Sequence, residues 1–332
     1  MTFRDLIGHR DVVRRLAAAG RRGPAHAYLL HGPEGVGKRA VADAFAAYLL
    51  CAETGDDACG TCRQCTRTRA GTHPDLSLVT RDDDRRDIRI DQARALVRWL
   101  TLRPMMAARK VALIDGAHLL NEHGQNALLK TLEEPPGASV VLLVAVQPSQ
   151  LLPTVRSRCQ AVGLGPLTRS DLEGALRARG VADAEAVLLA AQAGGSLGRA
   201  LALVGPEHAA LRRRVLEVLS TLPDRSAHEL SGLAQEVGRT APGPALEVAL
   251  AWYRDLLAHV SGTPELAGRN PDAEPALLAA AAHTTADVVL RQLERLCDTI
   301  IALERNANRV LAIETMLLAL RRLDRGAPSV SA

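Results

Sequence analysis

The chain has 332 residues, of which 47% are hydrophobic and 23% charged, with a formal net charge of +4. This composition is typical of a soluble protein with two or three domains. The sequence contains no apolar run of about eighteen residues, so we expect no membrane span. Residues 1–5 lack the apolar stretch of a signal peptide, so we expect a cytoplasmic protein. An aromatic content of 2% argues against a surface on which nucleic-acid bases stack.

The first half of the sequence predicts strands that alternate with helices. Apolar runs predict strands at 27–31, 76–79, 111–115 and 139–146. Helical spacing predicts helices at 11–19, 38–50, 91–100 and 121–134. The unbroken apolar run at 139–146 is typical of a strand buried on both faces. Strands separated by helices predict a parallel sheet with helices on both sides, an α/β fold.

A phosphate-binding loop is predicted where the first strand meets the second helix. Its G-x-x-x-x-G-K pattern consists of Gly32, Pro33, Glu34, Gly35, Val36, Gly37 and Lys38. The glycines let backbone N–H groups point at phosphate, and Lys38 supplies a positive charge. The next residue would be Ser or Thr in a site that holds Mg²⁺, but here it is Arg39. Arg39 either projects to solvent or folds over the loop in place of the cation; a third reading is a loop kept only for packing.

Four of the six cysteines fall within fifteen residues, directly after the second predicted helix. They are Cys51, Cys59, Cys62 and Cys65. Four thiolates at this density suit a closed, tetrahedral and therefore structural Zn²⁺ site. The ion would hold together a loop that has no core of its own. The alternative is a flexible loop with free thiols; the nearby His73 is expected to be a hydrogen-bonded structural residue.

The predicted strand 111–115 ends in an acidic residue that would face the phosphate loop. Asp115 would hold Mg²⁺ through water, or else cap the helical turn that follows. Active ATPases place a Glu after this Asp to polarise the attacking water, whereas this chain has Gly116. We therefore expect hydrolysis near background.

An arginine-rich segment follows the buried strand and Pro153. It reads Arg156-Ser157-Arg158-Cys159. An arginine at the tip of such a domain reaches a neighbouring subunit's nucleotide in some ATPases, where it stabilises transition-state charge. The alternative is an ordinary surface salt bridge.

After 164–166 the strand pattern stops and only helices are predicted. A small helical bundle covers 168–204, with its last helix capped after Gly194-Gly195-Ser196. Longer helices are predicted at 211–222, 227–237, 244–260, 286–305 and 309–323. The expected domains are 1–165, with a cysteine module at 51–65, then 166–205 and 206–325, followed by a disordered tail at 326–332.

Together these segments resemble the clamp-loader branch of the AAA+ ATPases. The resemblance covers the whole chain and is carried by N-A-L-L-K-T-L-E-E-P-P at 126–136, by the four-cysteine insert and by S-R-C at 157–159. Within this branch the chain is most similar to the delta-prime subunits of bacterial DNA polymerase III, through G-T-H-P-D at 71–75 and N-A-N-R-V-L-A-I-E at 306–314. The resemblance implies a five-stranded parallel AAA+ sheet, a helical lid at 166–205 and an all-α collar at 206–325 by which subunits oligomerise.

The resemblance also implies roles for single residues. Arg158 would be an arginine finger that completes the ATP site of the adjacent subunit, the four cysteines would bind zinc, and the segment 3–8 would contribute to an adenine pocket. The family's sensor-1 residue belongs at 145–146, where this chain has apolar Ala145 and Val146. The sensor-2 arginine would follow G-S-L, but Gly198 stands there and Arg199 comes one residue late, about 100° away on a helix.

These departures imply a clamp-loader subunit that does not hydrolyse ATP itself. It would belong to the DNA polymerase III holoenzyme without ATPase or polymerase activity of its own, with structural zinc and with ATP or ADP as a possible ligand of a degenerate site. The implied partners are the tau/gamma and delta subunits and, through the complex, the sliding clamp and primer-template DNA; no membrane is involved. Two alternatives are an active AAA+ motor subunit and a zinc-containing DNA-binding module, which would need a concentrated basic face.

Overall fold

The computed structural model describes residues 1–53, 55–82, 85 and 87–326. The chain folds into two compact units, Met1–Ala175 with Gly195–Arg199, and Leu176–Gly194 with Ala200–Ala332. The expected lid at 166–205 is therefore divided between the units, and the division into three domains stays a prediction. The disordered tail was expected at 326–332, and residues 327–332 lie outside the described residues. Across the described segments, no helix combines the length and the apolar character that crossing a membrane requires.

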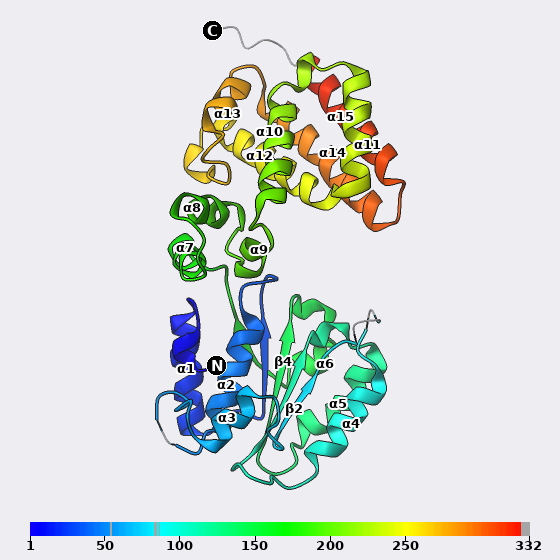
Figure 1. Ribbon diagram of the computed structural model, residues 1–332. Coiled ribbons are helices and arrows are strands. Elements are labelled where there is room, and N and C mark those ends of the chain that lie inside the picture. The colour runs from blue at the N-terminus through cyan, green and yellow to red at the C-terminus, as the bar shows by residue number, and fades with distance from the viewer. Residues whose placement is uncertain (54, 83–84, 86, 327–332) are drawn as a thin grey trace. The chain divides into compact units, whose positions relative to one another are not determined.

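The first unit is built on a five-stranded parallel sheet (Figure 1). Its strands are β1 (Ala27–His31), β2 (Leu76–Val79), β3 (Lys110–Asp115), β4 (Ser139–Ala145) and β5 (Gln160–Gly163). Their order is β2-β3-β4-β1-β5, so β1 and the loop that follows it lie between the central strand β4 and the edge strand β5. β4 is buried along its whole length, as its apolar run predicts. The predicted α/β fold with a five-stranded parallel sheet is confirmed. β5 was not located from the sequence, because two of its four residues are not apolar.

Helices cover both faces of this sheet (Figure 1). The helices of the first unit are α1 (Arg10–Arg22), α2 (Lys38–Leu50), α3 (Arg63–Arg69), α4 (Ile90–Leu100), α5 (Glu122–Glu133) and α6 (Pro153–Arg156). Because successive strand side chains point to opposite faces, Leu142 and Val144 pack with α1 and α2, while Leu143 and Ala145 pack with α4 and α5. The functional loops follow the carboxyl ends of these strands.

The rest of the chain is helical, as predicted. Its helices are α7 (Arg169–Arg177), α8 (Asp183–Gln192), α9 (Leu197–Ala202), α10 (Pro206–Ser220), α11 (Ala227–Thr240), α12 (Pro242–Val260), α13 (Glu274–Ala281), α14 (Ala286–Glu304) and α15 (Arg309–Arg325). The Ser196 hydroxyl accepts a hydrogen bond from the Arg199 N–H at 3.1 Å, which confirms the expected cap of α9. α13 was missed because its alanine-rich sequence has no clear polar face.

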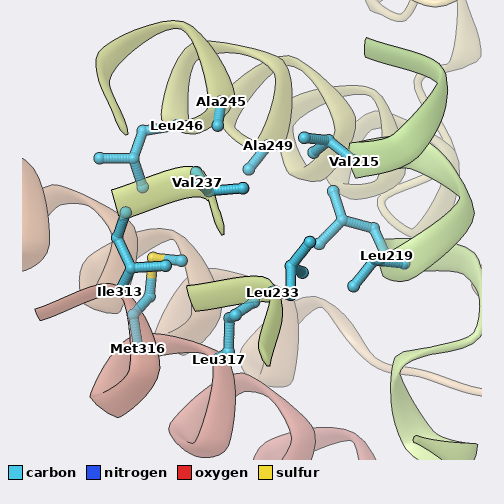
Figure 2. Close-up of a pocket in the computed structure, with 11 residues that line it drawn as sticks. Val215, Leu219, Leu233, Val237, Ala245, Leu246, Ala249, Ile313, Met316 and Leu317 are labelled. Atoms are coloured by element: carbon cyan, nitrogen blue, oxygen red, sulfur yellow. The ribbon is translucent and has the colours of Figure 1, made fainter. Parts of the chain in front are cut away.

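The helical core of the second unit surrounds Trp252, which is 1% exposed. Side chains from α10, α11, α12 and α15 converge on a small cavity of about 30 Å³ (Figure 2). The residues that line it are all apolar, so the cavity offers no hydrogen-bond partner to a water molecule. Burial of these apolar faces is the main source of stability in this unit.

The loop before α13 is held by a buried carboxylate. Asp255, 2% exposed, accepts hydrogen bonds from the backbone N–H groups of Gly268, Arg269 and Asn270. Arg212, also buried, pairs through both terminal nitrogens with Asp272. Each buried charge therefore has polar partners: Asp255 has three backbone N–H groups, and Arg212 has the carboxylate of Asp272, which is 45% exposed. The interior of a protein accepts charges that are partnered in this way.

Candidate functional site

The loop between β1 and α2 has the backbone shape of a phosphate cradle. Gly32, Gly35 and Gly37 have φ angles of 148°, 71° and 99°, a region that favours glycine. Within the described part of the chain, the N–H groups of Gly35, Val36 and Gly37 donate to no protein acceptor. Unpaired N–H groups before a helix are the donors that phosphate oxygens accept. Phosphate binding here stays a prediction.

The Lys38 side chain contacts the backbone of the phosphate loop that precedes it. Its Nζ donates to the carbonyl oxygens of Gly32 at 2.9 Å and Pro33 at 2.6 Å. The side chain is buried, and burial lowers its pKa. The ammonium group therefore stabilises the loop in place of a ligand's phosphate.

Arg39 occupies the acidic side of the site. Its Nε donates to both carboxylate oxygens of Asp43 at 3.0 Å, and its Nη1 donates to Asp115 Oδ2 at 3.0 Å. Burial lowers the pKa of Arg39, but the two carboxylates more than offset this effect, so the pKa lies above its usual value and the guanidinium stays charged. The guanidinium is thus paired with two carboxylates and does not project freely into solvent. That it stands in place of a cation stays a prediction.

The residues present do not fit a Mg²⁺ ion bound in the usual way. No hydroxyl follows Lys38, and Asp115 is already neutralised by Arg39. Gly116 has a φ of 78°, and a Cβ built on it would lie 3.0 Å from Leu119 Cδ1. The position where active ATPases carry a Glu is therefore strained for any side chain.

The start of α9 packs directly on the phosphate loop. The Gly198 N–H donates to the Gly35 carbonyl at 3.1 Å, and a Cβ on Gly35 would lie 2.1 Å from Ser196 Oγ. A Cβ on Gly198 would lie 3.2 Å from Gly35 Cα. This close approach favours glycine at both positions, so a sensor-2 arginine at 198 would be crowded. Ala145, at the expected sensor-1 position, is a buried methyl group with nothing to bond a phosphate.

The structure brings the four predicted cysteines together. The sulfur atoms of Cys51, Cys59, Cys62 and Cys65 all lie within 4.8 Å of one another. The Cys51–Cys62 and Cys59–Cys65 sulfurs are 4.0 and 3.9 Å apart. Zn–S bonds of about 2.3 Å in a tetrahedron place the sulfurs about 3.8 Å apart, so the donor set fits zinc.

Backbone N–H groups point at three of these sulfurs, although burial raises the pKa of the Cys51 and Cys65 thiols. The N–H groups of Cys59, Cys62 and Cys65 each point at the sulfur of a preceding cysteine, at 3.3 to 3.5 Å. The N–H of Cys62 lowers the pKa of Cys59 to about 6, which favours the thiolate form that metals bind. Zinc binding itself stays a prediction.

The cysteine segment is tied to the rest of the first unit. The Asp57 carboxylate accepts hydrogen bonds from the N–H groups of Phe3 at 2.8 Å and Arg4 at 3.0 Å. His73 is buried and bonds Gln64 Oε1 through Nε2 at 2.7 Å, so it lies outside the metal group, as expected. The segment that the resemblance assigns to the adenine pocket is therefore anchored by the cysteine loop.

Arg158 lies between α6 and β5 and is a third exposed. Its Nη1 donates to the Thr154 carbonyl at 2.9 Å, and its Nη2 lies 2.5 Å from Glu133 Oε1. These two contacts involve no residue of the chain's own phosphate loop. A finger role in a neighbouring subunit stays a prediction.

Two carboxylates in these sites were not singled out from the sequence. Asp43 follows Arg39 by four residues, a spacing at which helical side chains meet, so this pair was detectable. Glu133 is 25 residues from Arg158 in the chain, and no local pattern links the two.

Comparison with known proteins adds the family. A family model described as DNA polymerase III, delta subunit, matches residues 8–168. DNA polymerase III subunit delta' of Pseudomonas aeruginosa is 44% identical over 207 residues, which are 61% of this chain and 63% of that protein. The alignment thus spans less than two thirds of that relative's length.

Two further relatives are a delta' subunit and a tau subunit. DNA polymerase III subunit delta' of Bacillus subtilis is 32% identical over 240 residues, 70% of this chain and 72% of that protein. DNA polymerase III subunit tau of Escherichia coli is 36% identical over 243 residues, 69% of this chain but only 37% of that protein. The extent of the match to the subunits named delta' confirms the resemblance drawn from the sequence motifs, and the chain belongs to the delta-prime subunit family of DNA polymerase III.

Proposed function

We propose that this chain is a clamp-loader subunit that hydrolyses no ATP itself and donates Arg158 to the ATP site of a neighbouring tau/gamma subunit. Its partners would be tau/gamma and delta subunits, and the assembly would load a sliding clamp onto primer-template DNA in the cytoplasm. The helices at 206–325 would form its share of the oligomeric collar.

The observation that carries the proposal is the ion pair between Arg39 and Asp115, with Nη1 and Oδ2 3.0 Å apart. Hydrolysis of a nucleoside triphosphate depends on a metal ion to neutralise developing charge and on a group that orients water. Here a fixed guanidinium faces the acidic residue, and the position of the water-orienting Glu is Gly116. A chain with these residues would have no turnover at its own site.

The exposure of Arg158 supports action in a neighbouring site. A guanidinium that is a third exposed and held by a surface carboxylate is available to a second subunit. An arginine supplied in trans stabilises the charge on the transferring phosphoryl group and raises the rate by about 10³ to 10⁵. The catalytic contribution of this chain would therefore appear only in the assembly.

The cysteine cluster supports a structural zinc in this proposal. Four thiolates would fill all positions of a tetrahedral ion and leave none for a substrate. The zinc would keep the loop 51–65 in shape, and through Asp57 it would keep the N-terminal segment in place.

The direct test replaces Arg158 with Ala in the reconstituted complex. We expect the single-turnover rate of ATP hydrolysis to fall about 10³-fold at the one site that Arg158 serves. Arg156→Ala is the matched control, because it removes an exposed arginine two residues away. Unchanged DNA-stimulated turnover with Arg158→Ala would rule out the finger role.

A further inference from the structure

Arg158 is held in one place by groups from two segments that are distant in the sequence. Its Nη1 donates to the Thr154 carbonyl at 2.9 Å, and its Nη2 pairs with Glu133 Oε1 at 2.5 Å. Thr154 belongs to α6, while Glu133 is the last residue of α5. An arginine side chain has many rotamers, so two fixed partners restrict where its guanidinium lies.

Glu133 is poorly placed for helix stability, which indicates another role. A negative charge at the carboxyl end of a helix faces the negative end of the helix dipole. Pro135 and Pro136 prevent α5 from extending beyond Glu133. Glu133 therefore stays in the last turn of the helix. The positive charge of Arg158 offsets this unfavourable position.

The ion pair restrains the Arg158 side chain and still leaves N–H donors available to a phosphate group. The guanidinium has five N–H donors, and the contacts with Thr154 and Glu133 employ two of them. Both side chains are partly exposed, at 33% for Arg158 and 48% for Glu133, so water screens the ion pair and it opens readily. A phosphate group of higher charge from a second subunit would engage the remaining donors or displace the carboxylate.

We propose that Glu133 is a positioning residue that holds Arg158 ready for the nucleotide of the neighbouring subunit. The inference rests on the proposed finger role and adds to it a carboxylate that would contact neither the nucleotide nor the attacking water. It also gives a function to the L-E-E-P-P end of α5, which helical periodicity alone describes only as a helix stop.

The test measures single-turnover ATP hydrolysis in the reconstituted complex with Glu133→Ala. We expect the maximal single-turnover rate at the served site to fall about two- to five-fold, since an exposed ion pair contributes little energy. The ATP concentration that gives half of this rate should stay the same. Glu133→Gln keeps an oxygen that accepts the Arg158 hydrogen bond, so it should recover part of the lost rate. Glu134→Ala is the matched control, because it removes the adjacent exposed carboxylate.

The double variant Glu133→Ala/Arg158→Ala separates positioning from a general structural effect. If Glu133 acts through Arg158, the double variant has the rate of Arg158→Ala alone. Losses that multiply, or a Glu133→Ala rate equal to wild type when Arg158→Ala is impaired, overturn this inference and leave the finger role intact. An Arg158→Ala complex with the wild-type rate overturns both.

Discussion

At the scale of single residues, Arg39 changes the charge of the predicted nucleotide site. A Ser or Thr hydroxyl at this position would leave Asp115 free to hold a metal through water. The guanidinium instead forms ion pairs with Asp43 and Asp115, and it is covalently part of the chain. It therefore cannot be released or exchanged as an ion can, and the site is neutralised permanently.

This account predicts that Arg39→Thr introduces a Mg²⁺-dependent response. The variant frees Asp115 and supplies a hydroxyl, so ATP binding measured by calorimetry should become stronger with Mg²⁺ than with EDTA. Hydrolysis should remain at background because Gly116 is unchanged. Arg39→Ala, which frees Asp115 without adding a hydroxyl, is the control and should show a smaller effect. Equal Mg²⁺ dependence in the wild type and Arg39→Thr would contradict this role of Arg39.

The same residues mark what the sequence can and cannot predict about the site. The loop glycines, Lys38 and the missing Glu follow from local motifs, because each chemical role has a fixed spacing. The partners of Arg39 and Arg158 do not all follow from such motifs: Asp115 and Glu133 reach them through tertiary packing. The direction of Arg39 was left open by the sequence for this reason.

At the scale of elements, strong periodicity and buried apolar runs located most helices and strands. β1 and α2 were predicted with the bounds that the structure has, because an apolar strand, a glycine loop and an alanine-rich helix follow one another. β5 and α13 were missed because both are short and lack a clear pattern. The loop before α13 depends on the buried Asp255, a long-range contact that no local pattern reveals.

The cysteine loop gives a prediction at this scale. We expect purified protein to contain about one zinc per chain, and Cys62→Ser to lose the metal because a tetrahedral site needs all four thiolates. The loop should then become the first site of limited proteolysis. Metal analysis and protease mapping measure both effects, with Cys297→Ser as a control outside the cluster. Full zinc content in Cys62→Ser would show that these four sulfurs do not form the site.

At the scale of the whole molecule, a partly buried acid in the helical unit links stability to pH. Burial raises the pKa of Asp324 to about 6, although its oxygen accepts a hydrogen bond from Gln292 at 2.6 Å. Because the pKa is raised above the unfolded value of 3.8, the folded state binds the proton more tightly. The resulting stability is fully present below the unfolded pKa and is lost as pH rises through about 6.

Asp324→Asn should therefore stabilise the chain more at pH 7.5 than at pH 5. The expected difference between the two conditions is about 1 kcal/mol in the free energy of unfolding. Melting temperatures of the wild type and the variant at both pH values measure it, and groups that titrate in both proteins cancel. A gain that is the same at both pH values would mean that Asp324 is not the titrating group.

In the proposed assembly, this chain would hydrolyse no ATP itself and would supply an arginine to the ATP site of its neighbour. Asp115, beside the chain's own loop, is paired with Arg39, and the start of α9 packs on that loop, whereas Arg158 is a third exposed.

The most direct test compares ATP turnover by the isolated chain with turnover by tau/gamma subunits assembled with it. The account predicts no turnover above background from the isolated chain. It also predicts that adding the wild-type chain raises turnover by the assembly and that the Arg158→Ala chain, once assembled, does not. Turnover by the isolated chain, or equal stimulation by Arg158→Ala, would contradict it.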